Sequence, residues 1–108
     1  MTRLHIKVTF KDYEFRRAKA TPNGALAHTT QDWIGKQVIV MPMPMTVTDR
    51  LIESNYDETA EEYTMTFKDT PILNKQVKAS TTTGRIYLPK EYIGLDVLIL
   101  EEPHYNHI

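Results

Sequence analysis

The sequence predicts a single, mainly β domain formed by an internal duplication. Residues 4–10 alternate apolar and polar side chains, as a strand with one buried face does. Residues 38–41 and 97–100 are continuous apolar runs, which suit strands that are buried on both faces. Short landmarks also recur in the same order in both halves of the chain, which is the mark of a repeated unit.

Five landmarks align the two copies with small gaps. The first copy is three residues shorter before its first glycine and one residue longer after it. Because 108 residues are too few for two independent domains, the copies are expected to share one core. The aligned landmarks are Val8–Asp12 with Met65–Asp69, Lys19-Ala20 with Lys78-Ala79, Gly24 with Gly84, 32–40 with 91–99, and Pro44 with Pro103. The expected divisions are repeat one at 4–45, an acidic connecting segment at 46–63, repeat two at 64–103 and a short tail at 104–108.

Each copy is expected to run strand, turn, strand, short link, strand. Gly24 and Gly84 suit the turns, and residues 85–88 alternate before Pro89 ends their strand. The link 89–94 has proline at its start and glycine at its end, which predicts a single helical turn. One further short helix is predicted over residues 49–54, with Thr48 as its N-cap.

Three segments leave alternatives open. The prolines of Met41–Met45 disfavour a central strand, so this segment is either a core edge or a protein-binding surface. The acidic segment 53–62 is either a solvated linker or a docking site for a basic partner. His104 and His107 lack further ligands at metal-binding spacing, so a frayed tail is expected there.

The composition and motifs exclude several function classes. No apolar run approaches the ~20 residues that a membrane helix needs, and the first residues lack an uncharged signal core, so a cytoplasmic protein without membrane contact is expected. The chain has no cysteine. Adjacent carboxylates would point to opposite faces of a strand, and no nucleophile, phosphate-loop or zinc motif occurs. We therefore expect no enzymatic activity, no catalytic residues, no metal and no cofactor.

Charge is distributed unevenly although the net charge is only −1. Residues 1–22 carry a net charge of +4, residues 46–63 carry −5, and residues 75–90 carry +4. Two basic stretches therefore flank one acidic stretch. The second basic stretch surrounds a hydroxyl-rich turn, Ser80–Thr83, whose side chains are able to donate to phosphate oxygens.

Residues 78–100 resemble the AbrB/MazE/SpoVT family. The resemblance rests on Gly84-Arg85, two alternating strand residues, Pro89-Lys90, a short helix and then an apolar strand. It is closest to a small archaeal, transposon-associated subset whose helix ends in an aromatic residue followed by Ile-Gly, as Tyr92–Gly94 does. The close match covers about a quarter of the chain, and about half when the first copy is included.

The resemblance implies a fold and a function. The fold is a swapped-hairpin β-barrel in which two copies, normally from two chains, exchange hairpins, so this chain would form an intrachain pseudo-dimer with short helical turns. The function is that of a DNA-binding transcriptional regulator or an antitoxin-like protein, acting on double-stranded DNA as a monomeric pseudo-dimer or a homodimer. The alternative is a protein–protein interaction module on the same barrel that does not bind DNA.

The expected DNA contacts come from both copies. Arg85 is the candidate for a bidentate contact to guanine, although an arginine here is also able to bridge to an acidic residue. The first copy lacks this arginine and the proline-lysine but keeps Trp33–Gly35, so the two halves are not expected to present identical faces. The candidate residues are Lys78, Thr82, Arg85 and Lys90 in the second copy, with Arg16, Arg17 and Lys19 in the equivalent region of the first.

Overall fold

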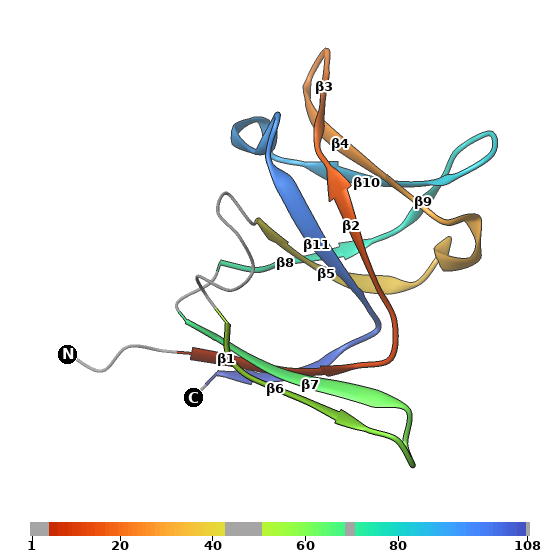
Figure 1. Ribbon diagram of the computed structural model, residues 1–108. Coiled ribbons are helices and arrows are strands. Elements are labelled where there is room, and N and C mark those ends of the chain that lie inside the picture. Colours follow the sequence, from red (N-terminus) through yellow and green to blue (C-terminus); the bar gives the residue numbers. More distant parts are fainter. Residues whose placement is uncertain (1–4, 43–50, 69–70, 108) are drawn as a thin grey trace.

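The computed structural model describes residues 5–42, 51–68 and 71–107. These residues form a mainly β protein with three four-stranded antiparallel sheets, which we name A, B and C (Figure 1). Sheet A contains, in spatial order, β12 (His104–His107), β1 (His5–Phe10), β7 (Glu62–Lys68) and β6 (Leu51–Asp57). Sheet B contains β2 (Tyr13–Arg17), β11 (Asp96–Glu101), β5 (Gln37–Pro42) and β8 (Leu73–Gln76). Sheet C contains β3 (Lys19–Thr21), β4 (Gly24–Thr29), β10 (Gly84–Leu88) and β9 (Lys78–Ala79).

Sheet B lies between the other two sheets, and its central strands β5 and β11 are buried on both faces. Alternate side chains of β5 and β11 enter two separate cores, because successive residues of a strand point to opposite faces. The core shared with sheet C includes Val38, Val40, Val97 and Ile99. The core shared with sheet A includes Ile39, Met41, Leu98 and Leu100. The prediction that these apolar runs are buried on both faces is thus confirmed.

The strand pairing repeats with approximate two-fold symmetry about the centre of each sheet. In sheet B, Val40 pairs with Ile99, which lies 59 positions later in the chain. On either side of this pair, Val38 pairs with Glu101 and Pro42 pairs with Val97. A shift of 59 positions carries Val38 onto Val97 and Pro42 onto Glu101, so the two flanking pairs are equivalent. The same shift relates the two backbone hydrogen bonds of 2.9 Å that Gly35 donates to Val77 and Gly94 donates to Ala18. Residues 59 positions apart therefore occupy equivalent places in sheets B and C. In sheet A the symmetric pair is Val8 with Met65, so the shift between β1 and β7 is 57.

The two halves are interleaved rather than placed side by side. Strand β2 of the first half pairs with β11 of the second half, and β8 of the second half pairs with β5 of the first. In sheet C the central pair is β4 with β10, again one strand from each half. Each half thus completes the sheets of the other, as expected for two copies that share a core.

The structure corrects the alignment of the two turns. Ala20 pairs with Ala25 just as Ala79 pairs with Gly84, so Gly84 is equivalent to Ala25, and Gly24 is equivalent to Thr83. The predicted alignment of Gly24 with Gly84 was therefore wrong by one residue. The pattern of burial along the strands, rather than the identity of the glycines, fixes the equivalence, because Ala25 and Gly84 are both buried whereas Gly24 is not.

The short links form single helical turns, as predicted. They are the 3₁₀ helices η1 (Gln31–Trp33) and η3 (Lys90–Tyr92), each of which buries one aromatic side chain, Trp33 or Tyr92. Gly35 and Gly94 follow them with φ angles of +87° and +81°, which favour glycine. These turns connect sheet C to sheet B in both halves.

Two predictions of local structure were wrong. Residues 51–54, expected at the end of a helix, belong to strand β6, because pairing with β7 overrides the local capping signal. Residues 104–107, expected as a frayed tail, form strand β12, which pairs with β1. Residues 48–50 and 43–45 lie outside the described residues. Pro42 is tolerated in β5 because β8 pairs only as far as Val40.

The expected closed barrel is also not present in the part of the chain that the structure describes. Each sheet is open, with two edge strands. The physical reason is that, among these residues, the edge strands β2 and β8 of sheet B do not pair with the edge strands β3 and β9 of sheet C. The second face of sheet B is covered by sheet A.

Candidate nucleic-acid interface

The outer face of sheet C carries the candidate site. Along β4 and β10 the side chains alternate strictly between buried and accessible positions. The inward residues, such as Ala27 and Ile86, belong to the core shared with sheet B. The outward residues therefore form the exposed surface of one end of the three-sheet stack (Figure 1). They are Leu26, His28, Arg85 and Tyr87.

Lysines extend this surface to both edges of the sheet. Lys19 of β3 pairs with Leu26, and Lys78 of β9 pairs with Arg85, so both lysines lie at outward positions. The two lysines are 59 positions apart and thus occupy equivalent places in the two halves. Residues 18–31 and 71–90, which include all four strands of this sheet, contain no aspartate or glutamate. The strands and turns of this face therefore carry basic side chains and no carboxylate of their own. Glu14 of β2, which accepts hydrogen bonds from Thr29 and from the Thr30 amide at the end of β4, is itself ion-paired with Arg16.

Arg85 is the central cation of this face. Its neighbours across the sheet are His28 on β4 and Lys78 on β9, neither of which neutralises a guanidinium. Its Nε atom is buried and has no hydrogen-bond partner among the described residues. The bridge to an acidic residue that the sequence left open is not formed there. An unpaired buried donor costs about 1–3 kcal/mol, so a ligand oxygen that pairs with this guanidinium would be favoured.

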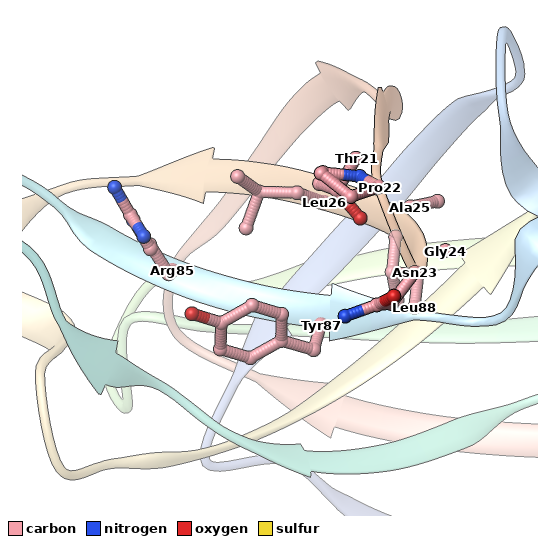
Figure 2. Close-up of a pocket in the computed structure, with 9 residues that line it drawn as sticks. All are labelled: Thr21, Pro22, Asn23, Gly24, Ala25, Leu26, Arg85, Tyr87 and Leu88. Carbon is pink, nitrogen blue, oxygen red and sulfur yellow. The ribbon is translucent and has the colours of Figure 1, made fainter.

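A pocket of about 500 Å³ opens beside Arg85 on the same face. Figure 2 shows Arg85 and Tyr87 on β10, with Leu26 on the neighbouring strand β4. The turn 21–24 between β3 and β4 forms its other wall. Tyr87 is 52% exposed, so the pocket combines a cation, an accessible aromatic ring and polar turn atoms. These are the groups that nucleic acids contact through phosphates and bases.

The second turn of the sheet lies at the other end of β10. Its backbone closes through a hydrogen bond of 2.9 Å that the Ser80 amide donates to the Thr83 carbonyl. The Thr83 hydroxyl lies 3.2 Å from Nδ1 of His28, which fixes the turn against β4. Thr82 is exposed at this turn. The predicted residues Lys78, Thr82 and Arg85 therefore belong to one edge of sheet C.

The structure separates the remaining predicted residues from this cluster. Lys90 is exposed on η3, beyond the opposite end of β10 from Arg85. Arg16 and Arg17 lie on β2 in sheet B, where Arg16 is ion-paired with Glu14 and Arg17 with Asp96 at 3.1 Å. Of the three first-copy residues, only Lys19 shares the outer face of sheet C.

Sequence reasoning missed Leu26, His28 and Tyr87. The alternation of residues 24–29 and 84–88 contained the necessary signal, since every second residue of a half-buried strand faces outward. Charge alone does not mark these three residues, because none of them is a lysine or an arginine.

Other binding chemistry is not apparent in residues 5–42, 51–68 and 71–107. No group of three or more metal-binding side chains occurs within them. No helix in that part of the chain has the length and hydrophobicity to cross a membrane. Comparison with models of known families, with curated proteins and with solved structures finds no match to this chain.

Proposed function

We propose that this protein binds double-stranded DNA through the outer face of sheet C and acts in the cytoplasm as a transcriptional regulator or antitoxin-like protein, without enzymatic activity. One observation carries the proposal: a basic sheet face with no carboxylate in its strands or turns, centred on an arginine without an acidic partner. Phosphate contacts by such cations supply most of the affinity in DNA binding, and a free guanidinium is suited to guanine.

We also propose that the chain is an AbrB-like swapped-hairpin pseudo-dimer. The interleaving of β2 with β11 and of β8 with β5 supports this, because each half contributes a strand that completes the other half. The second half also supports it through its Gly84-Arg85, its Pro89-Lys90 and the short helical turn that ends at Gly94.

The two halves would contact DNA unequally. Lys19 and Lys78 are equivalent and lie at opposite edges of the sheet, where both are able to reach the phosphate backbone. The position equivalent to Arg85 is occupied by Leu26, so only one half carries the base-reading arginine. We therefore expect one strong half-site instead of a palindromic operator, whose symmetry would require two equal readers.

Fluorescence anisotropy tests this proposal directly. The protein is titrated into a labelled duplex from upstream of its own gene and into a random duplex, at low and at moderate salt. Arg85→Glu is expected to weaken binding at least ~10-fold, because a good arginine–base contact contributes about 1–3 kcal/mol and the reversed charge also repels phosphate. Arg17→Glu is the matched control, since it makes the same change of charge on sheet B.

Absence of binding at low salt would overturn the DNA proposal, as would equal losses of affinity for Arg85→Glu and Arg17→Glu.

A second function, as a protein-interaction module, is favoured by a different observation: Tyr13, Phe15 and Tyr56 are each at least 40% exposed although they are large and apolar. Exposed apolar clusters of this kind mark interaction surfaces.

A further inference from the structure

A cluster of aromatic rings from both sheets joins β1, β7 and β6 of sheet A to β2 of sheet B. Tyr63 of β7 is central: its ring centroid lies 5.5 Å from that of Phe10, 5.7 Å from Tyr13 and 4.7 Å from Tyr56. Phe15 continues the cluster, 6.0 Å from Tyr13. Phe15 is 46% exposed and Tyr56 is 50% exposed, so the cluster reaches the surface.

An apolar pocket of about 200 Å³ opens within this cluster. Tyr13 and Phe15 of β2 form one wall, Met65 of β7 forms the other, and Phe10 and Leu98 complete the lining. The pocket lies between sheets A and B and is separate from the basic face of sheet C. Its lining contains no charged side chain.

The internal two-fold symmetry shows what fills the equivalent place in the other half. Tyr105 of β12 pairs with Val8 of β1, and Ser54 of β6 pairs with Met65 of β7, so Tyr105 and Ser54 hold equivalent positions. The Tyr105 ring packs against the core shared by sheets A and B. Its hydroxyl lies 3.1 Å from Nδ2 of Asn74, which is the equivalent of Phe15. In one half a tyrosine therefore bridges the two sheets, whereas in the other half a serine leaves the pocket open.

The turn beside the aromatic cluster is acidic. The turn between β6 and β7 carries Asp57, Glu58, Glu61 and Glu62 in sequence, and Tyr56 and Tyr63 stand beside it. Strand β6 is an edge strand that pairs only with β7 in the described residues. Carboxylates next to accessible aromatic faces favour cationic side chains through Coulomb attraction and cation–π contacts.

We propose that this pocket binds an extended, lysine- or arginine-rich segment of a partner protein, which inserts one tyrosine-sized side chain between Phe15 and Met65. The inserted ring takes the place that Tyr105 takes in the other half, and the flanking cations lie against the β6–β7 turn. This inference is independent of DNA binding, because it uses a pocket between sheets A and B and no residue of the outer face of sheet C.

NMR titration of the full chain tests the proposal with three blocked peptides as probes. The first is Lys-Lys-Thr-Tyr-Thr-Lys-Lys, the second has serine in place of tyrosine, and the third has glutamate in place of lysine. The first peptide is expected to shift the signals of the Met65 methyl group and of Phe15 and to bind with a Kd near ~1 mM or below. The other two are expected to bind at least ~10-fold more weakly.

Two variants sharpen the test. Ser54→Tyr fills the pocket from within, so it is expected to abolish the shifts at Met65. Asn55→Tyr adds the same ring to the same strand but on its opposite face, so it is expected to leave them unchanged. Shifts that are absent at all concentrations, or equal for the lysine and glutamate peptides, would overturn the proposal. A dimer by light scattering that Ser54→Tyr converts to a monomer would also overturn it, because a second copy would then occupy the pocket.

Discussion

At the scale of single residues, Gly84 shows how tightly the buried side of sheet C is packed. A Cβ atom at this position would lie 2.5 Å from Cγ1 of Val77 and 2.9 Å from Cγ2 of Thr29. Gly84→Ala is therefore expected to lower the free energy of unfolding by about 1–3 kcal/mol through overpacking. Urea denaturation measures the change. Thr82→Ala is the control in the adjacent exposed turn, and a loss for Thr82→Ala as large as that for Gly84→Ala would contradict this explanation.

Lys36 and Tyr92 are expected to make the free energy of unfolding fall at alkaline pH. The hydrogen bond of 2.5 Å to Glu101 raises the pKa of Lys36 above its usual 10.5, and burial raises the pKa of Tyr92 above its usual 10.0. Both side chains have a higher pKa in the folded protein than in the unfolded chain, so the folded state holds their protons more tightly. Their contribution to the free energy of unfolding is therefore complete below about pH 10 and is lost as the pH rises through the pKa values of the folded protein. Thermal unfolding from pH 8 to 12 is expected to show this decline. Tyr92→Phe should make the decline shallower, and an unchanged slope would remove Tyr92 from the explanation.

At the scale of elements, the strands are expected to differ in their protection from hydrogen exchange. Strands β5 and β11 are buried on both faces, whereas all residues of β6 after Leu51 are exposed. Local opening requires less free energy where fewer apolar contacts are broken, so β6 amides should exchange fastest among the paired strands and β11 amides slowest. Native-state exchange followed by NMR measures both. Similar protection in β6 and β11 would show that sheet A opens only together with the whole molecule.

The elements also show what the sequence was able to predict. Continuous apolar runs identified β5 and β11, because burial on both faces requires apolar side chains at every position. Local signals failed for β6 and β12, whose partners β7 and β1 supply the pairing that determines their conformation. For the candidate site, sequence identified Lys19, Lys78 and Arg85. It did not separate Arg16 and Arg17 from them, since that separation depends on which sheet each strand joins.

At the scale of the whole molecule, the aromatic cluster could not be predicted because its rings come from strands distant in sequence. Phe10 and Tyr13 belong to the first half, but Tyr63 joins them only through the pairing of β1 with β7. The pocket lies between sheets A and B, whereas the basic face is the outer face of sheet C, which lies beyond sheet B (Figure 1). The protein is therefore expected to bind DNA and a basic peptide at the same time, and the anisotropy titration should be unchanged when the peptide saturates the protein.

The interleaving of the halves predicts how fragments of the chain behave. A cut in the turn between β6 and β7 yields residues 1–59 and 60–108. Neither fragment keeps the partners of its edge strands in sheets A and B, since β2 pairs with β11, β8 with β5, β6 with β7 and β12 with β1. Each fragment alone is therefore expected to be unfolded as a monomer, because it exposes most of both cores. An equimolar mixture should regain the circular dichroism spectrum of the intact chain and the mass of one copy of each fragment.

The second fragment has one other route to a folded state. In the intact chain, Val40 of β5 pairs with Ile99, its equivalent on β11. In two copies of residues 60–108, Ile99 of one copy is able to take the place of Val40 and pair with Ile99 of the other. Strand β11 would then pair with β11 in the same register. Light scattering is expected to find this fragment as either an unfolded monomer or a folded dimer that carries Arg85 twice. A folded monomer would contradict the interleaved arrangement. The dimer would regain two equivalent base-reading arginines, so it should prefer a palindromic duplex, which the intact chain is not expected to do.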